Sequence, residues 1–178
     1  MTAKKKTIAK TLVSFLLILA ALLSVYFGIK ASFPLKYTKI AKSFGLEPKL
    51  ACSVMRAESG FDEKAKSRAG ALGLMQLMPS TAQFICEQKK IEYLPQKMLD
   101  GAYNAYLGCA YLSYLFNRFP AEETALAAYN AGEGTVSNWL SNRDYSDDQI
   151  HLKKIPYPET ESYVKKVLKF KKIYDFYY

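Results

Sequence analysis

The sequence predicts an all-α protein in which a single helical domain follows one long apolar helix at the N-terminus. After residue 31, apolar residues recur at helical spacing, and no stretch shows the sustained polar and apolar alternation of a strand. Residues 11–29 form a continuous run without a charged side chain. Half of the 178 residues are hydrophobic and 14% are aromatic, so the chain is able to bury a core and is not intrinsically disordered.

The uncharged run at the N-terminus is long enough to cross a membrane. As a helix it would span about 28 Å, close to the ~30 Å hydrocarbon core of a bilayer. The apolar region of a signal peptide is usually shorter, and residues 27–32 are a poor match to a small-x-small cleavage site. We therefore expect an uncleaved anchor over residues 11–30, with a cleaved signal peptide, and hence a secreted protein, as the alternative.

The charges that precede this run predict its orientation. Residues 1–10 contain four lysines and no acidic residue. By the positive-inside rule, this basic segment stays in the cytoplasm, and residues 31–178 lie on the outer side of a single-pass membrane protein.

Seven helices are expected within residues 31–178. Pro48 stands near the start of the second, where its missing N–H is not needed, and Gly60 follows its end. The fourth is apolar nearly all round, which predicts a central helix covered by its neighbours. The seventh places Tyr163, Val167, Phe170 and Tyr174 on one face. The expected ranges are 35–44, 47–59, 79–89, 100–118, 122–129, 134–140 and 159–176.

The composition limits the chemistry that is available. One histidine, His151, and three scattered cysteines are too few for a His/Cys metal site or for Cys-His catalysis, so we expect no metal and no cofactor. Cys52, Cys86 and Cys109 are odd in number, and buried free thiols are favoured over a disulfide. The net charge is +9, but no dense basic face is evident, so we expect no nucleic-acid partner. Any chemistry of this protein is therefore expected to use carboxylates, hydroxyls and amides.

Glu58 is the first candidate among the carboxylates. Leu50, Val54 and Ala57 form an apolar stripe on the 47–59 helix, and Glu58 falls at its edge, directed toward packing rather than bulk water. It also lies at the helix C-terminus, where the helix dipole disfavours a negative charge. Both effects raise the pKa of a carboxyl, as a general acid requires. A structural carboxylate paired with an arginine is the alternative.

Three further segments carry candidate groups. Gly70–Pro79 is a turn of small and apolar residues with one amide, Gln76, and is either a ligand-approach loop or a tight interhelical turn. Tyr129 and Asn130 end a helix and suit sugar recognition, or else form a simple C-cap. In the segment from Pro156 to Tyr163, Glu159 and Glu161 are able to complement a helix N-terminus.

Taken together and in order, these motifs resemble a known family. Residues 38–176 are similar to the catalytic domain of the soluble lytic transglycosylases, the SLT family, which has a goose-type-lysozyme-like fold and cleaves peptidoglycan. The resemblance rests on five motifs in register: 58–61 (ESGF), 70–79 (GALGLMQLMP), 104–112 (NAYLGCAYL), 127–132 (AAYNAG) and 155–163 (IPYPETESY).

The resemblance implies a mechanism and a site. Glu58 would be the sole general acid and base, cleaving between N-acetylmuramic acid and N-acetylglucosamine to leave a 1,6-anhydro product. Tyr163 would lie beside the Glu58 carboxyl and orient it. The implied residues of the glycan groove are Ser59, Met75, Gln76, Tyr129 and Asn130.

Other functions remain open from the sequence. A hydrolytic muramidase would admit water to the same site. A non-catalytic glycan-binding or assembly module of an envelope machine would not need Glu58. The basic 159–176 helix would suit docking to an envelope or secretion partner, which is compatible with catalysis.

Overall fold

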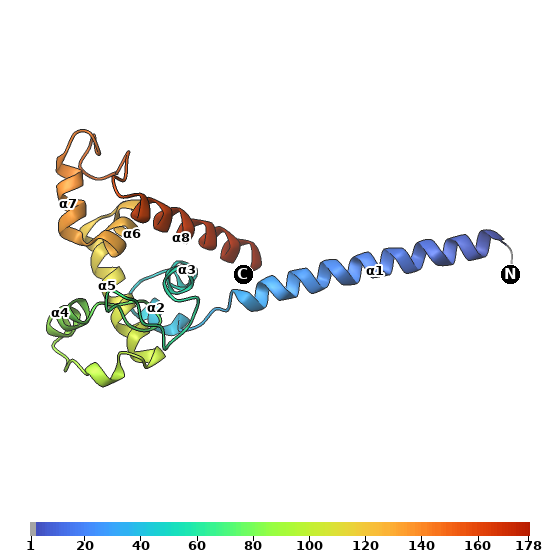
Figure 1. Cartoon of the computed structure of the whole chain (residues 1–178), viewed down its shortest axis with the longest axis horizontal. Helices are drawn as coiled ribbons and strands as arrows, with labels where there is room; N and C mark the ends of the chain where they lie inside the picture. Colours follow the sequence, from blue (N-terminus) through green and yellow to red (C-terminus); the bar gives the residue numbers. More distant parts are fainter. Residues whose placement is uncertain (1–2) are drawn as a thin grey trace. The chain divides into compact units, whose positions relative to one another are not determined.

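The computed structural model describes residues 3–178, without the side chains of residues 3–7 and 9 (Figure 1). The chain divides into two units, Met1–Pro34 and Leu35–Tyr178. All regular structure within the described residues is helical, apart from two isolated bridges that pair Leu72 with Lys66 and Leu77. The prediction of an all-α protein is therefore confirmed.

The first unit is dominated by helix α1 (Ala3–Ser32). Its segment Lys10–Ser32 is long and apolar enough to cross a membrane, and none of it is buried within the protein. A long, exposed apolar helix is what a membrane-spanning segment requires. The predicted boundary at residue 10 lies within this helix, and most of the predicted basic segment 1–10 lies outside the described residues or side chains. The assignment of segments 1–10, 11–30 and 31–178 stays a prediction.

The second unit contains every other helix. Each of the seven predicted helices is present with ends that differ by at most three residues, and a short 3-10 helix, η1, was not predicted. The helices are α2 (Thr38–Ser43), α3 (Pro48–Glu58), α4 (Pro79–Lys89), η1 (Pro95–Lys97), α5 (Gly101–Arg118), α6 (Glu122–Ala131), α7 (Glu133–Ser141) and α8 (Pro158–Tyr177).

Helix α5 is the central helix of this unit, as predicted. It packs against α2, α4 and α6, and its side chains from Asn104 to Leu115 are largely buried. The Asp100 carboxylate caps its N-terminus by accepting from the Tyr103 N–H at 2.8 Å. Gly108 allows the Met75 side chain to approach, because a Cβ at this position would collide with Met75. The hydrophobic core draws only on residues from Ala41 to Val167 and is thus contained in the second unit.

Helices α3 and α8 pack side by side and run in opposite directions. At one end, Lys49 of α3 forms an ion pair of 3.3 Å with Asp175 of α8. At the other, Lys166 Nζ of α8 donates to the Ala57 carbonyl near the end of α3 at 2.6 Å. The face predicted for α8 is the packed one, with Tyr163, Val167 and Tyr174 buried and Phe170 half-buried. This pair of helices brings the N-terminal part of α8 to the C-terminal end of α3.

The three cysteines are free and buried, as favoured by the sequence. Desolvation raises the pKa of Cys52 to about 11 and that of Cys109 to about 12, so both remain thiols at neutral pH.

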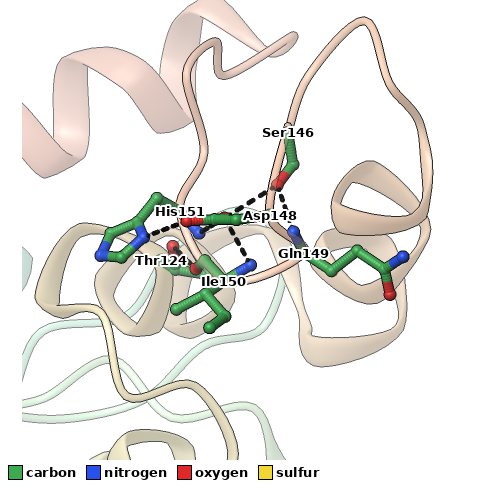
Figure 2. A network of polar contacts seen from close by, with 6 residues as sticks. All are labelled: Thr124, Ser146, Asp148, Gln149, Ile150 and His151. Carbon is green, nitrogen blue, oxygen red and sulfur yellow. Dashed lines mark hydrogen bonds and ion pairs between the residues drawn. The ribbon is translucent and has the colours of Figure 1, made fainter.

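The loop between α7 and α8 is organised around Asp148 (Figure 2). Its carboxylate accepts from the N–H groups of Ile150 and His151, each at 2.8 Å, and contacts His151 Nδ1 at 2.7 Å. The loop is tied to α6 by Thr124, whose hydroxyl donates to the Ile150 carbonyl at 2.9 Å. His151 is therefore occupied by a structural contact on an exposed loop.

Candidate active site

A cleft of about 470 Å³ opens beside the C-terminal end of α3. Glu58, the last residue of that helix, forms part of its wall. The remaining wall comes from the 67–81 segment, the middle of α5, the end of α6 and the start of α8. Its polar and aromatic members include Ser67, Gln76, Thr81, Tyr111, Tyr129, Asn130 and Glu159.

Glu58 is half-buried, and its carboxyl is held partly in its neutral form. Desolvation raises its pKa from 4.5 to about 7, against the opposing effects of the Tyr163 hydroxyl and the Lys166 ammonium. The sequence predicted the direction of this shift and its main cause, burial at the edge of an apolar stripe. A carboxyl with a pKa near neutrality is able to give up and take back a proton in one reaction cycle.

Tyr163 lies next to Glu58, as the resemblance implied. Its ring is buried, and its hydroxyl is close enough to lower the Glu58 pKa, yet it makes no hydrogen bond of regular geometry within the described residues. An unpaired buried hydroxyl is costly and uncommon in native proteins. In catalytic sites such a contact often tightens only when substrate is bound. That Tyr163 orients the Glu58 carboxyl stays a prediction.

Tyr129 is fixed at the cleft wall by a chain of hydrogen bonds. Its hydroxyl donates to the Met75 carbonyl at 2.8 Å, and the Met75 N–H donates to Asn104 Oδ1 at 2.7 Å. Asn104 Nδ2 in turn donates to the carbonyls of Leu72 and Met98, both at 2.9 Å. The buried amide of Asn104 therefore anchors the 70–79 loop to α5 and, through the loop, holds Tyr129 in place.

Gln76 is a wall residue with a strained backbone. Its φ of 47° lies in the left-handed region that side chains rarely adopt. Its side-chain amide donates to the carbonyls of Gly73 at 2.8 Å and Ala65 at 3.3 Å, which holds the turn closed. Within the described residues, the side-chain oxygen of Gln76 accepts no hydrogen bond, and the residue lines the cleft.

Asn130 connects two walls of the cleft. Its side-chain oxygen accepts from the Thr160 hydroxyl of α8 at 2.8 Å, while the residue itself is exposed. Because Thr160 is buried, this bond fixes the orientation of the Asn130 amide, whose NH₂ group is then available to a ligand.

Two residues implied for the groove lie behind its wall. The Ser59 hydroxyl donates to the Leu74 carbonyl at 2.7 Å and joins the end of α3 to the 70–79 loop. The Met75 side chain is fully buried against α5. The structure therefore brings Glu58, Gln76, Tyr129 and Asn130 to the cleft, with Ser59, Met75 and Tyr163 supporting them. Direct glycan contacts by any of these residues stay predictions.

Two residues of the cleft wall, Tyr111 and Glu159, lie within the sequence motifs but were not predicted as site residues. Tyr111 of α5 packs against Tyr129, with ring centroids 5.4 Å apart, and burial raises its pKa to about 12. Glu159 of α8 is exposed on the cleft. Both belong to the matched motifs, so the motifs themselves were the available indication. Within residues 3–178, no three His, Cys, Asp or Glu side chains gather as ligands for a metal.

Comparison with known proteins identifies relatives of this domain. Residues 37–152 match the family model for the transglycosylase SLT domain. The soluble lytic murein transglycosylase of Salmonella typhimurium is 37% identical over 158 residues, covering 84% of this chain and 24% of that protein. The membrane-bound lytic murein transglycosylase C of Actinobacillus pleuropneumoniae is 36% identical over 109 residues, covering 55% of this chain and 30% of that protein.

Solved structures agree with the sequence relatives. The 70-kDa soluble lytic transglycosylase of Escherichia coli superposes with a TM-score of 0.71 at 34% identity, covering 82% of this chain and 25% of that one. An inactive Glu-to-Gln mutant of the lytic transglycosylase Slt from Pseudomonas aeruginosa has the same TM-score at 36% identity, covering 80% and 24%. The chain spans about a quarter of the length of its soluble relatives. Since the family model covers more than half of the chain, the chain belongs to the transglycosylase SLT domain family, as the sequence motifs indicated.

Proposed function

We propose that this protein is a peptidoglycan lytic transglycosylase that cleaves the β-1,4 bond between N-acetylmuramic acid and N-acetylglucosamine. The observation that carries the proposal is the Glu58 carboxyl, with its pKa raised to about 7, at the wall of an open cleft. Its relatives in the family are named lytic murein transglycosylases. In one of them, the inactive mutant carries glutamine in place of a glutamate.

In the first step, protonated Glu58 donates its proton to the glycosidic oxygen, and the bond from that oxygen to the muramoyl C1 breaks. With a pKa near 7, about half of the Glu58 carboxyls carry this proton at neutral pH. The departing N-acetylglucosamine keeps the proton as its new hydroxyl. Positive charge at C1 is met by the N-acetyl oxygen of the muramoyl residue itself.

In the second step, ionised Glu58 takes the proton from the muramoyl C6 hydroxyl, whose oxygen then bonds to C1. The product is a 1,6-anhydro sugar, no water is consumed, and Glu58 regains its starting protonation state. Lys166 and Tyr163 both favour the ionised form of Glu58, so they stabilise the enzyme between the two steps.

The position of the second cleft carboxylate favours this reaction over hydrolysis. Most glycosidases use a pair of carboxylates that flank the bond. Glu159 is exposed on the cleft. It is not among the causes of the Glu58 pKa shift, which are burial, the Tyr163 hydroxyl and the Lys166 ammonium. Glu159 would have to orient a water for a hydrolytic muramidase, which is the second candidate function. A non-catalytic glycan-binding module would not need a carboxyl with a raised pKa at the position of Glu58, so this candidate function is less favoured.

We further propose that α1 anchors the protein in the cell membrane, with its N-terminus in the cytoplasm and the catalytic domain outside. The length and exposure of its apolar segment support an anchor, and one group of relatives is named membrane-bound. A secreted protein formed by signal cleavage is the alternative. An envelope or secretion machine is a further possible partner of a tethered enzyme.

Mass spectrometry of peptidoglycan fragments tests the function. Residues 31–178, which contain the complete core, are incubated with purified peptidoglycan, with Glu58→Gln as the matched control. Fragments that depend on Glu58, resist borohydride and are lighter than hydrolysis products by one water would support the transglycosylase. Reducing ends would establish the muramidase instead. Absence of cleavage by a folded protein would point to the binding module.

A further inference from the structure

The exposed face of α8 carries a stripe of three lysines that ends in a phenylalanine. Lys165, Lys169, Lys172 and Phe176 follow one another at intervals of four, three and four residues, so they share one side of the helix. The buried residues Tyr163, Val167 and Tyr174 occupy the opposite side. Phe176 is 75% exposed, the highest value among the large hydrophobic residues of the second unit. A solvated helix face does not need an aromatic ring in this position.

The lysines near Phe176 are free to bind an anion. Lys165 pairs with Glu161, and Lys171, on a different face, pairs with Glu47 and Glu122. Within the described residues, Lys169 and Lys172 lie in no ion pair. The end of α8 therefore presents two unneutralised charges beside one exposed aromatic ring.

This end of α8 lies close to the point where the chain enters the domain. The Cys52 thiol of α3 donates to the carbonyl of Lys36, the second residue of the unit, at 3.3 Å. Tyr174 of α8 lies near enough to Cys52 for the two groups to interact electrostatically. Residues 33–37 alone separate α1 from α2, and a five-residue linker reaches less than about 20 Å. If α1 is inserted in a bilayer, the length of this linker limits the distance between the bilayer and the point where the chain enters the domain.

We propose that the C-terminal part of α8, through Lys169, Lys172 and Phe176, binds the surface of an anionic phospholipid membrane. The inference rests on the proposed membrane anchor but not on the proposed reaction. Lysines are attracted to anionic headgroups, and aromatic rings favour the interface between headgroups and acyl chains. The ring distinguishes a lipid surface from a soluble anionic polymer, which would satisfy the lysines and leave Phe176 in water.

Such docking would set the height of the cleft above the membrane. Since α3 and α8 run in opposite directions, Tyr163 and Glu58 lie at the far end of the helix pair from Phe176. Thirteen residues separate Tyr163 from Phe176 along α8, or about 20 Å. The cleft would then be held clear of the lipid, where a glycan strand is able to enter it.

Sedimentation with vesicles tests this surface without the anchor. Residues 31–178 are mixed with vesicles of phosphatidylcholine alone or with added phosphatidylglycerol, at low and high salt. We expect binding to the anionic vesicles that weakens with salt. Because each lysine near such a surface strengthens binding about fivefold, the Lys169→Glu/Lys172→Glu variant should bind at least about thirtyfold more weakly. The matched control, Lys90→Glu/Lys97→Glu, reverses two exposed lysines, one directly after α4 and one at the end of η1, and should bind normally. Helix α4 lies on the side of the domain away from the C-terminal end of α8 (Figure 1).

Phe176 provides the measurement that separates lipid from other anions. The chain has one tryptophan, Trp139, which is buried and serves as the internal reference. In a Phe176→Trp variant, vesicles with brominated acyl chains should quench the added emission and leave that of Trp139 unchanged. Phe176→Ser should weaken vesicle binding without changing cleavage of soluble fragments. Equal binding by the α8 and control charge variants, or unquenched Trp at position 176, would overturn the proposal.

Discussion

Two carboxyl groups of this domain, Glu58 at the end of α3 and Asp148 in the loop before α8, have pKa values that their surroundings shift in opposite directions. Glu58 is half-buried, and desolvation raises its pKa to about 7. Asp148 is exposed in a loop, where hydrogen bonds from the His151 and Ile150 N–H groups and from the His151 ring hold its pKa far below the usual value. Both residues lie in or next to segments that connect helices, so proximity to a loop does not determine the direction of the pKa shift.

The difference shows how a carboxyl becomes an acid in one place and a fixed anion in another. N–H donors stabilise the ionised form, and Asp148 has three of them. Glu58 lies at a helix C-terminus, where the backbone offers carbonyls rather than N–H groups. Its two opposing contacts, Tyr163 and Lys166, are weaker than the cost of its burial. The raised pKa of Glu58 therefore follows from burial at a position without N–H donors.

Replacing the titrating group has the largest expected effect. We expect Glu58→Gln to lower the rate of peptidoglycan cleavage at least about 10³-fold, since glutamine can neither donate nor accept the catalytic proton. Glycan binding should stay near that of the parent, because the wall residues keep their own hydrogen bonds. Fragment analysis gives the rate and calorimetry the affinity. Normal cleavage by this variant would remove Glu58 from the mechanism.

The same variant should be the more stable protein at alkaline pH. A pKa raised from 4.5 to about 7 stabilises the folded state below pH 4.5, and this contribution is lost as the pH rises through 7. The loss is on the order of 3 kcal/mol. Urea unfolding should thus show Glu58→Gln gaining on the parent by about this amount between pH 4 and pH 8. A constant difference across this range would mean that Glu58 is not desolvated.

Activity should follow the protonation of Glu58 in the parent. We expect kcat/KM to fall about tenfold for each pH unit above 7, because the proton-donating form is lost. The unshifted pKa of a glutamate would place this fall about two and a half pH units lower. The measurement is initial rates on soluble glycan fragments between pH 5 and pH 9, and a profile that is flat from 5 to 9 would contradict the assignment.

Tyr163 sharpens the comparison, because it is one of the two contacts that lower the Glu58 pKa against the effect of burial. Tyr163→Phe removes the hydroxyl but keeps the buried ring, so the fold should be retained. The Glu58 pKa should rise and move the alkaline limb of the pH profile upward. The rate should fall between about twofold and tenfold, the value of one hydrogen bond. A loss of rate with an unmoved pH limb would indicate a role in packing alone.

The sequence predicted the helices well, because each is encoded locally. Pro48 near a helix start, Gly60 after the end and the apolar stripe before Glu58 are short-range features, and the structure confirms them. The raised pKa of Glu58 followed from the same stripe. The pairing of α3 with α8 depends on residues some 110 positions apart, such as Ala57 and Lys166. Only the family resemblance indicated it.

Predictions for the cleft were limited by side-chain direction. Met75 was expected in the groove because its motif is there, but the space above Gly108 takes its side chain into the core. Ser59 likewise uses its hydroxyl on the Leu74 carbonyl. Conversely, Glu159 was interpreted as a helix N-terminal residue, and nothing local shows that the start of α8 meets the cleft. Such placements depend on tertiary packing, which a spacing pattern does not contain.

Replacing Asp148 has the smallest expected effect, and its effect on stability depends on pH in the opposite direction to that of Glu58. Asp148→Asn removes the charge that its three donors stabilise, so we expect Tm to fall slightly at pH 7, by a few degrees at most. The lowered pKa stabilises the folded state only at a pH where Asp148 is ionised. This difference in Tm should therefore shrink as the pH falls below the pKa of an ordinary aspartate. Hydrogen exchange should rise at the Ile150 and His151 amides, while the rate of glycan cleavage stays unchanged. A large loss of cleavage would instead show that this loop, although built on an exposed anion, supports the cleft through Thr124 and α6.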